Sequence, residues 1–562
     1  MKKLLICFCI LSIFACNKNL SQEKIINKEF KQPNVLWIVT EDISPTFSFY
    51  GDKTAKTPNL DKLSNQSIVY DNAFATVGVC APSRSSIITG MYPTSIGTMH
   101  MRAGKDVFSW GKRVYKKDTG IKDLEGGDVI EYAAVIPENV KCYTEYLRIA
   151  GYYTTNNAKT DYQFAAPVTA WDENNEKAHW RNAPKGKPFF SVFNIGTTHE
   201  SRLWKNENLS LTVDPKIVNV PPYLPDNKAS RKTIARHYSN VELMDAEVGA
   251  ILKQLKEDGL FDNTIIFFYS DHGGPLPRQK REIYDSGLKV PFMIKGVDGK
   301  IGRTDRLISF VDLAPTMLSL AGVKAPNYME GNAFLGEHNS DKREYVFGSS
   351  DRFDEFSDRL RAVRNKRYLY IKNDFPNLPK YKDVGYRKNV PLMPVFLELK
   401  KENKLNKVEQ IWFQTKTKEE LYDCILDPHN VKDLAKTPEY NNILGEMRAA
   451  LNNHIKDRKD YALQPESKMI QEMWPNFEQP ITRAVKLSTI ETSQGKNISL
   501  SSESKGASIA YIISDKSDEK LDLNSKWKVY YEPITVEKGK TIYTIAQRIG
   551  YKESEITLHK IN

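Results

Sequence analysis

The chain has 562 residues, of which 40% are hydrophobic, enough to build one large domain or several smaller ones. Lysine and arginine exceed aspartate and glutamate by 11, and a surplus of this size can steer polyanions toward the protein. No internal run is long and apolar enough to cross a bilayer, which argues against a polytopic membrane protein.

The N-terminus has the features of an export signal. Two lysines, a short hydrophobic stretch and a small residue before a cysteine predict a signal peptide over residues 1–15. The tetrapeptide IFAC resembles a bacterial lipobox, so we expect Cys16 to be lipidated and residues 16–31 to form a polar tether. Ordinary signal cleavage remains the alternative, because Phe14 is bulkier than a lipobox prefers. We therefore expect a periplasmic lipoprotein anchored to the outer membrane, with no nucleic-acid partner.

Apolar strands followed by polar residues recur in the first part of the chain. Continuous hydrophobic runs at residues 34–40, 187–195 and 263–270 are typical of strands covered on both faces. Helical patterns that end at glycine lie between them, which predicts a doubly wound α/β domain over residues 32–345. Sites in such sheets form beyond the carboxyl ends of the strands. One crevice should therefore hold the polar residues that follow these strands, namely Glu41, Asp42, His199, Asp271 and His272.

The pattern changes twice toward the C-terminus. Residues 361–373 read as a strand pair or one long strand, and a helix is expected near residues 441–455, so residues 346–475 form a smaller α+β subdomain. Residues 482–562 alternate at period two between turns, which predicts a separate β-sandwich module.

Acidic side chains at the strand ends suit a hard metal ion. Glu41, Asp42 and Asp271 offer the oxygen ligands that Ca²⁺ and Mg²⁺ prefer. Each could instead cap a helix or open a turn. His272 is the least certain ligand, because imidazole binds hard cations poorly.

Cys80 stands in an unusual context for a structural thiol. Outside the predicted signal, the cysteines are too few and scattered for a disulfide framework. Cys80 precedes a predicted helix, whose free N–H groups and dipole favour an anion, and Arg84 adds a fixed positive charge. Lys159, His199 and Lys280 could complete an anion pocket, although an isolated lysine is usually solvated and an isolated histidine usually structural.

These residues carry a family resemblance. The run Cys80-Ala-Pro-Ser-Arg84, followed by a Thr-Gly pair, resembles the signature of formylglycine-dependent sulfatases in the alkaline phosphatase superfamily. The resemblance extends over roughly residues 32–475. It also includes the acidic pair Glu41-Asp42, Lys159, His199, Asp271-His272-Gly273, Lys280 and the C-terminal Glu420-Leu-Tyr-Asp423 with Asp427-Pro-His.

The resemblance implies an alkaline-phosphatase-like fold and a mechanism of sulfate ester hydrolysis. A maturing enzyme oxidises the cysteine, here Cys80, to formylglycine (3-oxoalanine), whose hydrate attacks sulfur with one hydroxyl and expels sulfate with the other. Arg84, Lys159 and Lys280 would hold the sulfate oxygens, and His199 would act as general acid on the leaving oxygen. One Ca²⁺ would be bound by Glu41, Asp42, Asp271, His272 and the modified Cys80.

Two positions depart from the family pattern. Glu41 stands where the family often has aspartate, a change that the flexible coordination of Ca²⁺ should tolerate. The family's Lys-x-His reads Lys159-Thr-Asp161, so one histidine is missing, and either Asp161 or His100 could replace it.

The motif order is most similar to heparan N-sulfatase and to bacterial sulfatases acting on glycosaminoglycans or ulvan. We therefore expect a sulfated polysaccharide substrate. Arg352 and Glu355, in a charged stretch that could face the cleft, are candidate substrate ligands, although a solvated charge cluster is the common reading. The last module is similar to the immunoglobulin-like domains of chitobiase-type hydrolases.

Two other functions remain open from the sequence. One is a glycan-binding lipoprotein that kept the fold and lost turnover, in which Cys80 would stay unmodified. The other is a phosphodiesterase of the same superfamily, which would have threonine or serine at position 80.

Overall fold

A computed structural model of the chain describes residues 32–104, 114–492 and 495–561. The predicted signal peptide, Cys16 and the tether lie outside the described residues. Within these ranges, no helix combines the length and the hydrophobicity needed to cross a membrane.

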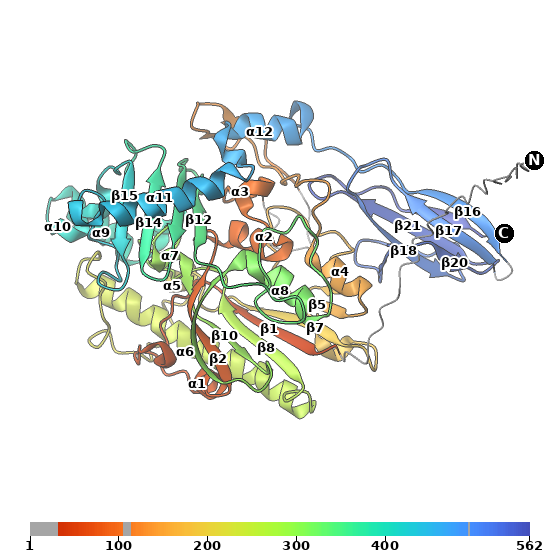
Figure 1. Cartoon of the computed structure of the whole chain (residues 1–562), viewed down its shortest axis with the longest axis horizontal. Coiled ribbons are helices and arrows are strands. Elements are labelled where there is room, and N and C mark those ends of the chain that lie inside the picture. The colour runs from red at the N-terminus through yellow and green to blue at the C-terminus, as the bar shows by residue number, and fades with distance from the viewer. Residues whose placement is uncertain (1–31, 105–113, 493–494, 562) are drawn as a thin grey trace, which may run out of the picture.

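The centre of the molecule is a nine-stranded mixed sheet (Figure 1). Strand β1 lies between β7 and β8 and runs parallel to both, and β5 runs parallel to β7. Strand β10 is antiparallel to its neighbours β8 and β2. In spatial order the strands are β11 (Gly302–Ser309), β2 (Ser67–Phe74), β10 (Phe292–Lys295), β8 (Thr264–Ser270), β1 (Asn34–Thr40), β7 (Phe189–Ile195), β5 (Tyr153–Asn157) and β6 (Glu173–Asn174), with β9 (Lys289–Val290) beside β2.

Both faces of this sheet are covered, which explains the continuous hydrophobic runs. Alternate residues of β1 enter two separate cores: Trp37 packs on one face, and Leu36 and Ile38 pack on the other. The first face is covered by α2 (Cys80–Thr89), α4 (Tyr143–Ile149) and α8 (Leu313–Leu320), and the second by α1 (Pro58–Ser64) and α6 (Lys228–Glu257). The predicted doubly wound mixed sheet is confirmed.

This part of the chain also contains three short helices and a small hairpin. They are α3 (Pro93–Ile96), α5 (Arg202–Lys205), α7 (Asp285–Leu288) and the strand pair β3 (Ile121–Lys122) and β4 (Asp128–Val129). Helix α6 begins after Asn227, whose side chain caps it by accepting a hydrogen bond from the backbone N–H of Ser230 at 3.0 Å.

A second, four-stranded antiparallel sheet follows. Its strands are β12 (Val346–Ser350), β13 (Leu360–Arg364), β14 (Tyr368–Asn373) and β15 (Glu419–Asp423), in that order. The sequence predicts either a strand pair or one long strand over residues 361–373. The structure shows a strand pair, the hairpin β13–β14. The accompanying helices are α9 (Leu392–Lys401), α10 (Lys407–Gln410), α11 (Asn441–Lys456) and α12 (Glu466–Met473).

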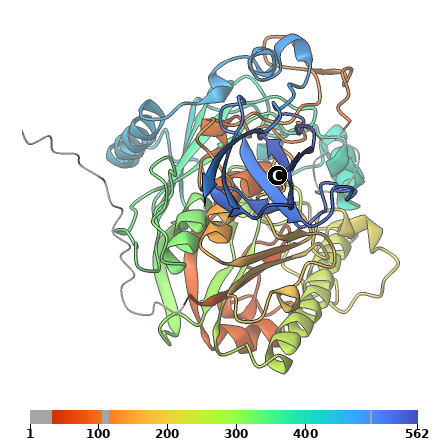
Figure 2. The ribbon, with the colours of Figure 1, turned by 90° about the vertical axis from the view of Figure 1, so that its right-hand side faces the viewer.

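The last part of the chain forms a β-rich module that projects from one end of the body (Figure 1) and faces the viewer in Figure 2. One sheet contains β16 (Lys486–Thr492), β17 (Gly495–Ser501) and β20 (Ile534–Val536); the other contains β19 (Lys528–Val529), β18 (Ser508–Ser514), β21 (Thr541–Gln547) and β22 (Thr557–Lys560). The domain boundaries stay a prediction.

This module is fastened to helix α4 by buried polar contacts. Arg148 donates to the carbonyl of Trp527 at 2.6 Å, and Ser508 donates to the Glu145 carboxylate at 2.6 Å. Charge-assisted hydrogen bonds of this kind are among the stronger ones in proteins. The module therefore packs against the body as a fixed part of the molecule.

Candidate active site

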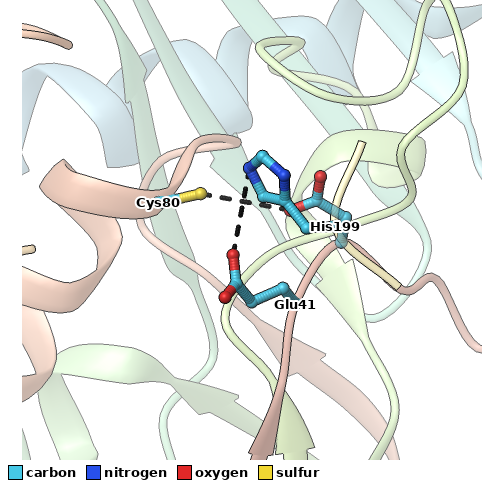
Figure 3. A group of neighbouring side chains, drawn as sticks. Glu41, Cys80 and His199 are labelled. Carbon is cyan, nitrogen blue, oxygen red and sulfur yellow. Dashed lines mark hydrogen bonds and ion pairs between the residues drawn. The ribbon is translucent and has the colours of Figure 1, made fainter. Parts of the chain in front are cut away.

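Side chains from four parallel strands meet at one edge of the large sheet, as expected from their position after each strand. Glu41 and Asp42 follow β1, Asp271 and His272 follow β8, and Lys159 and His199 follow β5 and β7. Figure 3 shows Cys80, Glu41 and His199 pointing toward one another from three separate segments of the chain. The predicted site residues are thus brought together, apart from those discussed below.

Cys80 is the first residue of α2 and is fully buried. Its Sγ lies 3.3 Å from His272 Nε2, 3.5 Å from Lys280 Nζ and 4.0 Å from Asp42 Oδ1. Two nitrogen groups that can carry positive charge therefore face the sulfur, together with the positive end of a helix dipole. The side chain at position 80 is thus surrounded by hydrogen-bonding nitrogen groups and one carboxylate.

The carboxylates form a compact acidic cluster around this point. The ligand atoms of Asp42, Cys80, Asp271 and His272 lie within 4.8 Å of one another, and those of Glu41, Asp42, Cys80 and His199 do so too. Asp42 and Asp271 are both completely buried. Buried carboxylates at this spacing need a cation, and hard oxygen donors suit a divalent one, so the residues fit a metal ion.

Lysine and histidine already oppose part of this negative charge. Lys280 Nζ lies 2.6 Å from Asp42 Oδ2, and His272 Nε2 lies 3.1 Å from Asp42 Oδ1. Burial raises the pKa of Asp42, but the charges of Lys280, His199 and His272 outweigh it and hold this pKa well below its usual value. Burial lowers the pKa of His272, but Asp271 and Asp42 outweigh it and raise this pKa to about 10. Asp42 is therefore an anion held by its neighbours.

Two further cations, Arg84 and Lys159, contact carboxylates of this cluster. Arg84 Nε lies 2.9 Å from Asp271 Oδ2, and its Nη1 donates to Asn194 Oδ1 at 2.6 Å. Among the described residues, the buried Nη2 of Arg84 has no hydrogen-bond partner. Lys159 Nζ lies 2.6 Å from Glu41 Oε2. Because a buried donor without a partner is costly, Arg84 Nη2 is available to an anionic ligand.

His199 lies at the mouth of the site. The backbone N–H of Ser201 donates to His199 Nδ1 at 3.2 Å, so a neutral ring carries its proton on Nε2. That nitrogen lies 3.9 Å from Glu41 Oε2. Burial, followed by the charge of Lys280, lowers the pKa of His199 well below its usual value. The ring is thus oriented with a donor N–H toward the reacting groups.

A cleft of about 670 Å³ is lined by Glu41, Lys159, His199 and Lys280 of this site. Several residues that line it were not singled out from the sequence, because they lie on loops and short helices that no motif marks. They are Arg102, Arg202, Lys205, Arg281 and Tyr386, and Asp354 of the charged stretch near residue 352 also lines the cleft. Arg281 is held by both carboxylate oxygens of Glu200 at 3.0 Å and by Asp354 at 3.0 Å. In the charged stretch near residue 352, Asp354 therefore faces the cleft.

The prediction that Arg352 binds substrate is wrong. Its guanidinium is buried and pairs with both carboxylate oxygens of Glu466, at 2.5 and 2.7 Å, and donates to the carbonyl of Met101 at 2.9 Å. These partners leave it no role in the cleft. Glu355 is exposed and is not among the residues lining the cleft, so its role stays a prediction.

Arg352→Ala is expected to act on stability. The substitution leaves Glu466 as a buried charge without its partner, which costs about 3–5 kcal/mol of the free energy of unfolding. Denaturant unfolding measures this loss, and replacing both Arg352 and Glu466 by methionine should recover part of it. A wild-type unfolding midpoint in Arg352→Ala would contradict the structural role.

Of the two candidates for the missing histidine, Asp161 lines the cleft and His100 does not. Asp161 lines the cleft, 3.7 Å from Lys159 Nζ and 3.4 Å from Arg102 Nη1. His100 is buried outside the cleft, where its Nδ1 accepts from the backbone N–H of Arg352 at 3.2 Å. Burial lowers the pKa of His100 to about 4, which keeps that ring neutral.

Comparison with known proteins agrees with this geometry. Residues 33–323 match the family described as Sulfatase, and residues 278–378 match the family described as N-sulphoglucosamine sulphohydrolase, C-terminal. The chain belongs to the sulfatase family. It is therefore a sulfate ester hydrolase, as the resemblance of the Cys80 pentapeptide predicted.

Three relatives illustrate the range of this sulfatase's similarities. An ulvan-active sulfatase of Formosa agariphila is 42% identical over 93% of this chain and 91% of its own. Human N-sulphoglucosamine sulphohydrolase is 24% identical over 74% of this chain and 89% of its own. A solved structure of a 2-O glycosaminoglycan (GAG) sulfatase matches 76% of this chain and 93% of its own with a TM-score of 0.55 at 20% identity, which supports the shared fold.

Proposed function

We propose that this sulfatase removes sulfate from a sulfated polysaccharide or its oligosaccharides, of the ulvan or glycosaminoglycan kind. The observation that carries the proposal is Cys80, buried at the start of α2 among carboxylates and cations and opening a sulfatase pentapeptide. The 42% identity to an ulvan-active sulfatase over nearly the whole chain supports the substrate class.

Formylglycine at position 80 and one Ca²⁺ complete the proposed site. The hydrated aldehyde would supply one hydroxyl to attack sulfur and a second to expel sulfate afterwards. Ca²⁺ would supply positive charge to the sulfate oxygens. Its proposed ligands are Glu41, Asp42, Asp271, His272 and the modified Cys80.

Side chains of the protein bind the sulfate group and protonate the leaving oxygen. Arg84, with its free Nη2, and the ammonium groups of Lys159 and Lys280 bind sulfate oxygens and oppose the charge that develops on them. His199 presents its Nε2 hydrogen to the leaving oxygen. An anionic sulfate ester beside the ring favours protonated His199, so bound substrate counteracts the lowering of its pKa. Burial of Cys80 keeps bulk water from the reacting atoms.

His199→Ala is expected to lower kcat on a sugar sulfate by about 10²–10⁴-fold, the range of a positioned general acid. The loss on an aryl sulfate should be smaller, because a phenol leaves without needing a proton. His179→Ala is the control: this half-buried histidine binds Gln254 at 3.0 Å outside the cleft. Equal losses on both substrates would contradict the role of general acid.

We also propose that the protein is exported to the periplasm and anchored to the outer membrane through lipidated Cys16. The signal-like N-terminus supports this location. A formylglycine-generating enzyme would be the maturation partner. Because Cys80 is fully buried within α2, that enzyme would have to act on the segment before the domain folds.

The test of the proposed function is sulfate release. Matured protein with Ca²⁺ is incubated with oligosaccharides prepared from ulvan and from heparan sulfate, and free sulfate is measured by ion chromatography. Release from one of them, absent in Cys80→Ala, supports the proposal. No release from either glycan by protein shown to carry formylglycine would overturn the substrate class.

A further inference from the structure

The outer wall of the cleft carries two cations that the chemistry described above does not use. Arg202 and Lys205 both belong to α5 and line the cleft. Positions three apart in a helix lie on the same face, so the two charges are neighbours. Both side chains are exposed, and among the described residues neither forms an ion pair that neutralises it.

Each of the other lysines and arginines that line the cleft forms an ion pair with an acidic side chain. Lys159 pairs with Glu41 at 2.6 Å and Lys280 with Asp42 at 2.6 Å. The same holds for the two remaining arginines. Arg281 pairs with Glu200 and Asp354, and Arg102 with Asp161. Among the described residues, the cleft cations without an ion-pair partner are therefore those of α5, where a charge interaction links Arg202 and Glu247.

Backbone hydrogen bonds fix the position of α5 next to His199. The backbone N–H of Arg202 donates to the carbonyl of His199 at 2.7 Å, and that of Lys205 donates to Ser201 at 2.9 Å. The helix thus continues directly from the histidine that faces the leaving oxygen. Substrate atoms beyond that oxygen belong to the sugar, so Arg202 and Lys205 lie on the sugar side of the scissile bond.

Aromatic rings also lie near His199 and α5. Tyr386 is 40% exposed, its ring centroid is 6.4 Å from that of His199, and it packs edge-on against Trp204 at 5.2 Å. Of these two rings, Tyr386 lines the cleft, and an exposed tyrosine offers an apolar face and a polar hydroxyl to a sugar ring. The cleft is thus lined by the proposed acid catalyst, an aromatic ring and the two cations of α5.

We propose that Arg202 and Lys205 bind a second anionic group of the substrate, one that is not hydrolysed. This group is a uronate carboxylate or a further sulfate on the sugar beyond the leaving oxygen. The inference rests on the proposed function for the class of glycan, but it concerns binding and not turnover. It makes the enzyme selective for polyanionic glycans over singly sulfated ones, since a neutral sugar leaves these charges unmatched.

The experiment measures binding of ulvan oligosaccharides to the full chain with Ca²⁺, by isothermal titration calorimetry, in a Cys80→Ala background that cannot turn them over. Arg202→Ala/Lys205→Ala is compared with Lys185→Ala/Lys187→Ala, which removes the same charge from exposed residues at the amino end of β7, away from the cleft. The α5 variant should raise the dissociation constant about tenfold at low salt, and the control should leave it unchanged.

Chemically altered glycans separate the two sources of the anion. If reducing the carboxyl groups to alcohols weakens binding to Cys80→Ala but not to the α5 variant, the group is a uronate carboxylate. If carboxyl reduction has no such effect and partial desulfation does, the group is a second sulfate. Equal affinities of the α5 and control variants, or no binding to Cys80→Ala, overturn the inference. A matured wild type that releases no sulfate, with α5-dependent binding intact, would instead overturn the proposed function alone.

Discussion

Replacing Cys80 by serine is expected to abolish the release of free sulfate and to limit desulfation to about one sugar per protein molecule. A serine Oγ can attack sulfur and displace the sugar alcohol, which forms a serine sulfate ester. That ester has no second hydroxyl on the same carbon to expel sulfate, so the enzyme stays blocked. Intact-protein mass spectrometry should show the added sulfate, and ion chromatography should show no free sulfate.

The control for this substitution is Cys80→Ala, which has no nucleophile and should neither gain mass nor release sulfate. Serine fits the space of the thiol, so both variants should unfold at about the wild-type denaturant concentration. Multiple turnovers by Cys80→Ser would contradict the requirement for an aldehyde hydrate at this position.

Asp42→Asn is expected to lower sulfate release by about 10³-fold or more. Asp42 accepts a hydrogen bond from the backbone N–H of Glu200 at 2.7 Å and opposes the charges of Lys280 and His272. An amide at this position places N–H donors against those cations and removes one of the proposed metal oxygens. The loss of the metal oxygen is measured by calorimetric melting with and without Ca²⁺. Addition of Ca²⁺ should raise the Tm of the wild type by a few degrees and leave the Tm of the variant unchanged.

The matched control is Asp258→Asn, which removes a carboxylate bound to Arg181 at the surface, outside the acidic cluster. That variant should keep both its activity and its response to Ca²⁺. Circular dichroism at the assay temperature establishes that Asp42→Asn remains folded. A folded Asp42→Asn protein with wild-type activity and an unchanged Ca²⁺ response would contradict the proposed metal site.

The sequence predicted best those features that depend on the strand pattern. Strands buried on both faces have continuous apolar runs, and parallel strands end at one edge, so Glu41, His199 and Asp271 could be placed together before the fold was known. The Cys80 pentapeptide indicated the family because its letters stand at fixed places in a contiguous segment. Local patterns of this kind can be recognised without knowledge of tertiary contacts.

The cleft wall could not be predicted in the same way. Arg352 and Asp354 are two residues apart, yet the first turns inward to Glu466 and the second faces Arg281. Which of them reaches the cleft depends on partners more than 70 positions away in the chain. Arg202 and Lys205 likewise carry no motif, and their position follows from the turn that joins β7 to α5. Loop residues of this kind are placed by long-range contacts that the sequence does not display.

Mass spectrometry of the peptide that contains Cys80, from protein made in its native host, tests the central claim most directly. The account predicts formylglycine, seen as a loss of about 18 Da relative to the thiol and as a hydrazide-reactive aldehyde. An unmodified thiol throughout, in protein that nevertheless releases sulfate, would contradict the proposed mechanism.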